Sequence, residues 1–427
     1  MSMHDFTWDL ETILITTIFL LGYLAIIFEY TIKLHKSGVA LLLAVMTWLI
    51  YIVTHHANVG EGVKILGEFV GQVAQIIFFL MGAMTLVELI DSHKGFKIIT
   101  DKIKTHSRRK LLWIIAVVSF FLSAVLDNLT TTILMVSLLR KLVPQHSERI
   151  LMGCIVVIAA NAGGAWTPIG DVTTTMLWID HRVSSLGVIK TIVFPAIVAF
   201  LIPMFWYTFR LKGRLPKAEK QLKEKLEPGA NVVLSLGIAG LIFVPIFKAI
   251  TGMPPYTGIL LSLSVLWIVT DLMHFKYEER SHLRVPHVLT RVDTSGILFF
   301  LGILLAVNAL EAAGLLHALA EWMNEAFKSQ DTIALVLGLL SACIDNVPLV
   351  AATMAMYPLA QYPMDIPFWH LIAYTAGTGG SIFIIGSSAG VAMMGIEKVD
   401  FFDYLKKAAL PALFGYFAGY AVYVAMH

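Results

Sequence analysis

Charged residues are scarce in this chain. They make up 14% of its 427 residues, whereas 58% are hydrophobic. A soluble globular domain carries about 25% charged residues, so the composition excludes a soluble protein and indicates a polytopic membrane protein. The formal net charge of +2 is too small to indicate a nucleic-acid partner. The partner that we expect is the lipid bilayer.

Cysteine is also nearly absent. Cys154 and Cys343 both fall in apolar segments, so a disulfide framework is not expected, and we interpret both as small core residues. The N-terminus carries Asp5, Asp9 and Glu11 and lacks a basic stretch before its first apolar run. We therefore expect no removable signal peptide and a retained first helix.

Apolar runs, by contrast, recur along the whole chain and predict an all-α polytopic fold. Four runs are too short to cross alone, because about 15 helical residues rise about 22 Å against a hydrocarbon core of about 30 Å. We interpret the pairs 110–126/129–143 and 332–344/347–360 as re-entrant hairpins. The remaining runs lie at 12–32, 37–54, 68–90, 150–180, 188–210, 231–250, 256–273, 293–313, 368–396 and 407–425.

Two long stretches of the chain resemble each other. Gly38 pairs with Gly258 and Gly82 with Gly302 at an offset of 220, SAVLDN matches SACIDN at 218, and NAGGAWTPIGD matches GTGGSIFIIGS at 216. Ordered matches of this kind predict two homologous halves. The predicted divisions are an N-terminal transmembrane helix at 1–36, a first repeat at 37–210, a cytoplasmic linker and connecting helix at 211–255, and a second repeat at 256–427.

The basic residues predict the orientation. When loops are assigned alternately to two sides, 26 of the 31 lysines and arginines fall on one side. By the positive-inside rule that side is cytoplasmic, and both termini lie outside. If the short pairs re-enter, five crossings separate corresponding points of the two halves, and the second repeat is inverted.

Each predicted hairpin tip carries an acid. Asp127 precedes Asn128, and Asp345 precedes Asn346. A charge at membrane depth costs about 3 kcal/mol or more and is kept mainly where it faces a site or a water-filled cavity. The alternative is that these residues are N-caps of the outgoing helices. Because serine or threonine would cap at lower cost, we favour a binding role.

A second polar group interrupts the apolar runs beyond each hairpin. In NAGGAWTPIGDVTTT, glycines and Pro168 break the helix and free carbonyl groups. Asp171 is the residue whose burial in the membrane costs free energy. For the hydroxyl residues, capping of local carbonyls is as good an interpretation as ligation. The polar candidates at the two breaks are Asn161, Thr167, Asp171, Thr173 and Thr174, and Thr378, Ser381, Ser387 and Ser388.

These residue types suit a small monovalent cation. Such an ion requires several oxygens, and carboxylates, amides, hydroxyls and free carbonyls at half-helix ends supply them. A carboxylate removed from water can also take up a proton near neutral pH. One group that holds either a proton or a cation is the simplest exchanger. The halves differ, because Asp171 corresponds to Ser387.

Weaker candidates lie elsewhere. Glu88 corresponds to Asn308 and is either a proton relay or an interfacial acid. His55 and His56 are adjacent and point to different faces of a helix, which favours an interfacial anchor over a metal site. The run KAEKQLKEK at 217–225 is most simply a solvated linker.

The motifs SAVLDNLTTT, NAGGAWTPIGDVTTT, SACIDN and GGSIFIIGSSAG resemble the NhaD family of sodium/proton antiporters, over nearly the whole chain. The resemblance implies two inverted repeats, each with a hairpin and a broken helix, in a homodimer of a bacterial inner membrane with periplasmic termini. It also implies Na⁺ or Li⁺ binding by a first group of residues, with a second group serving at the other tip. The first group is Asp127, Asn128, Asn161, Asp171 and Thr173, and the second is Ser341, Asp345 and Asn346.

The predicted function is therefore secondary antiport of cytoplasmic Na⁺ or Li⁺ for external H⁺, without enzymatic activity and without a cofactor beyond the transported ions. A sodium-coupled anion carrier is the alternative within transport, because one fold can host either substrate. The tips read Asp-Asn where related carboxylate carriers have Ser-Asn-Thr, which disfavours an anion. An intramembrane aspartyl protease is disfavoured because Pro168 stands where its motif requires glycine.

Overall fold

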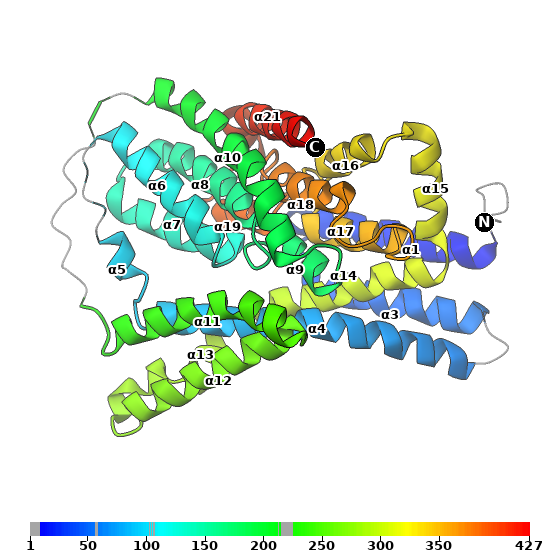
Figure 1. Cartoon of the computed structure of the whole chain (residues 1–427), viewed down its shortest axis with the longest axis horizontal. Helices are drawn as coiled ribbons and strands as arrows, with labels where there is room; N and C mark the ends of the chain where they lie inside the picture. The colour runs from blue at the N-terminus through cyan, green and yellow to red at the C-terminus, as the bar shows by residue number, and fades with distance from the viewer. Residues whose placement is uncertain are drawn as a thin grey trace. The chain divides into compact units, whose positions relative to one another are not determined.

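A computed structural model describes residues 9–55, 59–101, 103, 105, 107–211, 213–214 and 225–427 (Figure 1). Most of these residues are helical, and within them no β-strand forms beyond one isolated bridge between Ser107 and Arg214. The predicted all-α class is confirmed. His56, the side chain of His55 and residues 217–224 of the predicted linker lie outside the described residues.

Among the described residues, nine helical segments are long and apolar enough to cross a membrane. The chain is therefore a multi-pass membrane protein. Eight of the segments are α1 (Leu10–Ile27), α3 (Lys36–His55), α4 (Val59–Ser92), α8 (His146–Ala165), α10 (Ser185–Arg210), α11 (Ala230–Thr251), α12 (Pro255–His274) and α14 (Thr294–Ala312). The ninth combines α20 (Phe401–Tyr404), a π-helical turn at Leu405–Ala409 and α21 (Leu410–Met426).

Shorter helices occupy the places predicted for the hairpins and the breaks. The hairpin helices are α6 (Arg108–Ser123) with α7 (Asn128–Leu142), and α16 (Gln330–Leu340) with α17 (Asn346–Met356). The breaks separate α8 from α9 (Val172–Ile179) and α18 (Pro367–Gly379) from α19 (Ser388–Glu397). Re-entry of the hairpins into the membrane stays a prediction. The remaining elements are α2 (Glu29–Ile32), α5 (Lys97–Thr100), α13 (Val285–Val288), α15 (Leu315–Phe327) and 3₁₀ turns at Glu278–Leu283 and Leu289–Arg291.

The chain forms two compact units. The first comprises residues 1–81, 293–333 and 347–363. Its α3 and α14 lie side by side (Figure 1), because Gly302 lets the two backbones approach at Ala40. Ile26 of α1 joins the same buried apolar cluster. Close packing through a small residue is the usual way for helices to associate where no water drives them together.

The second unit comprises residues 82–292, 334–346 and 364–427. Within it α8 packs against α6, α7, α10, α18 and α19 (Figure 1). The buried face of α8 is nearly continuous from Ile150 to Ala165. A helix that is apolar and buried all round forms the core of its unit, and α8 carries Asn161 in that core. Both units draw on both predicted repeats, and the repeat boundaries stay a prediction.

Three features differ from the sequence-based expectation. α15 was not predicted, because it is short and carries charged residues such as Glu321 and Glu325 within its apolar pattern. α4 begins at Val59, about two turns before the predicted run, since Glu61 and Lys64 interrupt its hydropathy. The interpretation of Cys343 as a core residue is wrong: it is exposed in the turn before Asp345, while Cys154 is buried as expected.

Candidate functional site

The first hairpin turns at Asp127. The residue has an extended backbone and caps α7, with its two carboxylate oxygens accepting hydrogen bonds from the Thr130 amide (2.6 Å) and the Thr130 hydroxyl (2.7 Å). The capping interpretation is therefore correct for its geometry. The Asp127 carboxylate can still bind a further group, because a carboxylate has about four acceptor positions.

The first broken helix has Asp171 at its restart. α8 ends at Ala165, and Asp171 caps α9. The turn between them folds tightly because Gly164 and Gly170 lie in backbone contact, where any Cβ would collide. Gly170 also lies against the carbonyl of Ser123, at the end of α6. The hairpin tip and the break are therefore packed directly on each other.

The second hairpin and second break repeat these contacts. Gly380 lies against Gly386, and Gly386 lies against the carbonyl of Ser341. The Ser341 hydroxyl donates to the Ala376 carbonyl (2.8 Å), as the Ser123 hydroxyl donates to the Ala160 carbonyl (2.7 Å). Corresponding residues of the two sequence halves thus make corresponding contacts.

Side-chain amides connect the two halves within the second unit. Asn128 donates to the Oδ1 atom of Asn161 (3.0 Å), and the Nδ2 atom of Asn161 donates to the hydroxyls of Ser381 (2.9 Å) and Ser387 (2.8 Å). All four side chains are buried. Asn161 therefore holds a tip residue of the first half and two break residues of the second half in one network.

Asp171 is a buried carboxylate with weak hydrogen bonds. It is 1% exposed, and within the described part of the chain its oxygens accept two long hydrogen bonds, from the Thr173 amide (3.3 Å) and from Nδ2 of Asn346 (3.4 Å), with the Thr173 side chain close by. Asp127 and Asp345 are near enough for electrostatic repulsion. Among the described residues no lysine, arginine or histidine pairs with it. A buried carboxylate without a cationic partner is costly to maintain.

The threonine hydroxyls at the two breaks differ in their partners. Those of Thr174 and Thr378 donate to the carbonyls of Ala165 (3.2 Å) and Tyr374 (2.6 Å), so they satisfy local backbone. The Thr173 hydroxyl is buried and makes no hydrogen bond within the described residues. It lies one helical turn or less from Asp171 and can serve as a further oxygen ligand.

Two threonines of the first tip were missed by the sequence reasoning. Thr131 and Thr132 are fully buried on the same face of α7 as Asn128, and neither hydroxyl finds a partner within the described residues. Their spacing of three and four residues from Asn128 was the available signal. Buried, unpaired hydroxyls next to an acidic tip fit a site that binds cations.

Two candidates stand apart from this network. Among the described residues, the charged neighbours of Glu88 are Asp91 and Arg291, and its hydrogen-bonding neighbour is Ser92. Ser388 follows the cap Ser387 and is half-buried. Neither of them is bonded to the residues around Asn161, and their roles stay predictions.

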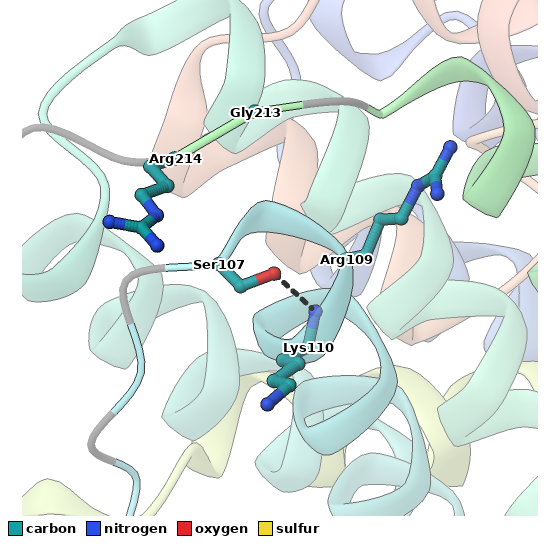
Figure 2. A pocket seen from close by; sticks show the side chains of 5 residues that line it. All are labelled: Ser107, Arg109, Lys110, Gly213 and Arg214. Atoms are coloured by element: carbon teal, nitrogen blue, oxygen red, sulfur yellow. Dashed lines mark hydrogen bonds between the residues drawn. The ribbon is translucent and has the colours of Figure 1, made fainter.

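A pocket of about 680 Å³ opens at the start of α6, away from these residues (Figure 2). It is lined by Ser107, Arg109, Lys110, Gly213 and Arg214. Figure 2 shows the Ser107 hydroxyl capping the amide of Lys110, while the Arg109 guanidinium extends away from it. Three cationic side chains would repel a cation, so this pocket does not compete with the acidic network as a cation site.

The residue types of the network suit a small hard cation. Carboxylate oxygens, amide oxygens and unpaired hydroxyls converge where helices are interrupted, and the interruptions leave carbonyls that no helix uses. Among the described residues of this network there is no cysteine or histidine, the residues that zinc and copper prefer. The negative charge that remains unpaired at Asp171 can be neutralised either by a cation or by a proton.

The chain is similar to known membrane transporters. A family model described as "Citrate transporter" matches residues 23–377. "Sodium/proton antiporter 1" of Arabidopsis thaliana is 50% identical over 427 residues, which cover 99% of this chain and 74% of that protein. "Na(+)/H(+) antiporter NhaD" of Alkalimonas amylolytica is 31% identical over 455 residues, covering 98% and 92%. The protein of that name from Vibrio cholerae is 28% identical over 457 residues, covering 99% and 92%.

Proposed function

The chain belongs to the citrate transporter family and is an NhaD-type member of it, and we propose that it is a sodium/proton antiporter that exports cytoplasmic Na⁺ or Li⁺ in exchange for external H⁺. The named relatives are transporters, which supports transport without enzymatic activity. The observation that carries the proposal is the buried carboxylate of Asp171, which has no cationic partner within the described residues. An ion that binds there supplies the missing charge.

The proposed cation ligands come from both interruptions. Asp127, Asn161, Asp171 and the unpaired Thr173 hydroxyl supply oxygens from the first half, and Ser341, Asp345 and Asn346 line the second tip. Asn128 orients the Asn161 amide, so that its oxygen is held in place. Na⁺ is the substrate here and leaves with each cycle.

Exchange follows from competition for the same carboxylates. A proton on Asp171 or Asp127 removes the charge that attracts the cation, and a bound cation displaces the proton. If only one of the two species occupies the site in each crossing, the gradient of one drives the other uphill. One net charge moved across 100 mV is worth about 2.3 kcal/mol, so a membrane potential can contribute when the exchange is unequal.

The proposed setting is a membrane whose cytoplasmic side carries the basic loops, with both termini outside. For the bacterial relatives this is the inner membrane. The two Arabidopsis relatives, at 50% and 48% identity, point to an origin outside bacteria. A homodimer is proposed from the family resemblance. Cross-linking in native membranes tests the dimer, and the accessibility of terminal tags from each side tests the orientation.

Exchange itself is tested in everted vesicles or proteoliposomes with an imposed proton gradient. We expect Na⁺ and Li⁺ to collapse the gradient and K⁺ to be a poor substitute. Vesicles without the protein give the background. A gradient that Na⁺ leaves untouched, with folded protein in the vesicles, would contradict the proposal.

The alternative function is sodium-coupled uptake of a carboxylate, which the family description favours. The acids at both tips and at the first break disfavour an anionic substrate, because like charges repel in a medium of low dielectric constant. Labelled citrate or succinate uptake decides between the two. Accumulation that requires Na⁺ would establish the alternative.

A further inference from the structure

One buried carboxylate lies outside the candidate site. Glu397, the last residue of α19, is 3% exposed. Its carboxylate oxygens lie 3.0 Å from Nε of Arg149 and 3.3 Å from Nε of Arg140. His146 completes the group, with Nε2 at 2.8 Å from the Glu397 carbonyl oxygen and 3.6 Å from its carboxylate. We call these four residues the Glu397 cluster.

The cluster joins three helices that also carry the candidate site. Arg140 lies in the last turn of α7, whose cap is Asp127. His146 and Arg149 lie in the first turns of α8, which carries Asn161 near its other end. α19 begins after its cap Ser387, which accepts the hydrogen bond from Asn161.

Two of these helices, α7 and α19, are short. α19 has 10 residues and α7 has 15, which correspond to about 15 Å and about 22 Å of helix. Tilting one of them at the cluster therefore displaces its other end, where Asp127, Asn161 or Ser387 lies. The cluster holds the three helices together through a charged hydrogen bond from Arg149, an ion pair with Arg140 and a hydrogen bond between His146 and the Glu397 carbonyl. A charged hydrogen bond is stronger and more directional than an apolar contact.

A second contact fixes the same junction. The guanidinium of Arg149 also donates to the carbonyls of Val143 (3.1 Å) and Pro144 (2.8 Å), in the connection between α7 and α8. Arg149 thus holds the connection and Glu397 simultaneously. Removing the carboxylate leaves the largely buried Arg149 guanidinium without its counter-charge, and breaking such a pair is unfavourable. Arg140 is more exposed, so water can solvate its charge.

We propose that Glu397 is a positioning residue for cation binding: it holds α7, α8 and α19 in the arrangement that brings Asp127, Asn161 and Ser387 together. The proposal rests on the proposed antiport function. It does not make Glu397 a ligand, because the length of α19 separates it from the site.

The test compares Glu397→Gln with Glu148→Gln in the full-length protein. Glu148 lies in the same first turn of α8 and is also paired with an arginine, Arg108, but that arginine belongs to α6 and not to α19. We expect Glu397→Gln to raise the KM for Na⁺ about tenfold, equivalent to about 1.4 kcal/mol, with a smaller change in kcat. Glu148→Gln should change KM less than about twofold. Glu397→Asp, which keeps the charge on a shorter side chain, should fall between Glu397→Gln and the wild type.

A second measurement reads binding without transport. Na⁺ stabilises the folded protein according to its affinity, so the rise of Tm with Na⁺ concentration should shift about tenfold to higher concentration in Glu397→Gln. If that variant does not fold, the double variant Arg149→Gln/Glu397→Gln removes both buried charges and should fold with the same weakened binding. An unchanged Na⁺ affinity in the folded variant would overturn the proposal. Failure of the wild type to exchange Na⁺ for H⁺ is a different result, which contradicts the proposed function.

Discussion

The two broken helices of the second unit have the same backbone design and different side chains. Both fold through glycines packed on a hairpin tip, and both hairpins donate a serine hydroxyl to the facing helix. The first break carries Asn161, Asp171 and Thr173, where the second carries Gly377, Ser387 and Ala389. The shared backbone builds the interruption, and the side chains of one half supply its charge. We infer that the first break binds the cation and the second supports it.

The largest expected effect separates Asp171 from Ser387. Asp171→Asn keeps the shape of the side chain and removes its charge, so we expect kcat/KM for Na⁺ to fall about 100-fold or more, at least about 2.7 kcal/mol. Ser387→Ala should cost less than about tenfold, because the serine contributes a neutral oxygen. Na⁺-dependent dissipation of a proton gradient measures both. Similar losses in the two variants would abolish the distinction between the breaks.

Exchanging the two residues tests whether position matters as well as charge. In Asp171→Ser/Ser387→Asp the number of carboxylates is unchanged, but the acid moves away from Thr173. We expect a loss close to that of Asp171→Asn, since Thr173 stays in the first half, where Ala389 is its counterpart. Folding is checked by the thermal unfolding midpoint. Recovery of most of the wild-type activity would mean that the two halves are interchangeable.

Asn161 links the breaks, and its removal should have an intermediate effect. Asn161→Ala deletes the hydrogen bonds to Asn128, Ser381 and Ser387 together. We expect the KM for Na⁺ to rise about tenfold, about 1.4 kcal/mol of binding. Thr378→Val is the matched control, because that hydroxyl donates to the Tyr374 carbonyl of its own helix. An Asn161→Ala variant with the control's KM would remove the amide network from the site.

The smallest expected effects concern the shared backbone. Ser123→Ala and Ser341→Ala each delete one buried hydrogen bond to the facing helix, so each should lower the free energy of unfolding by about 1 kcal/mol. Thermal unfolding in detergent gives both values under one set of conditions. We expect the two losses of stability to be comparable. A loss confined to one of the two variants would show that the two hydrogen bonds contribute differently to stability.

Much of this fold was predictable from apolar runs and their interruptions. Helix ends near Ala165 and Val172 follow from the glycines and Pro168 between them, because these residues disrupt helical hydrogen bonding. α15 was not predictable in this way, since Glu321 and Glu325 lower its hydropathy while its buried face is apolar. Cys343 was misjudged because an apolar neighbourhood in sequence does not reveal that the turn exposes it.

The candidate site was only partly predictable. Asp127 and Asp171 could be predicted, because a charged residue in an apolar run is costly to place in a membrane and is easily recognised in a sequence. The bond from Asn161 to Ser387 joins residues 226 positions apart, and no local pattern encodes which hydroxyl a buried amide will reach. Glu397 was missed for a similar reason: at the end of an apolar helix it resembles an ordinary interfacial acid until its two arginines are located.

In the proposed mechanism, protons and Na⁺ compete for the carboxylates of Asp127 at the first tip and Asp171 at the first break. The most direct measurement is proton release when Na⁺ is added to the purified protein in weakly buffered detergent solution. We expect Na⁺ to release protons from the wild type and from Ser387→Ala, and fewer or none from Asp171→Asn. Saturable Na⁺ binding without proton release from the wild type, or undiminished release from Asp171→Asn, would contradict the proposed mechanism.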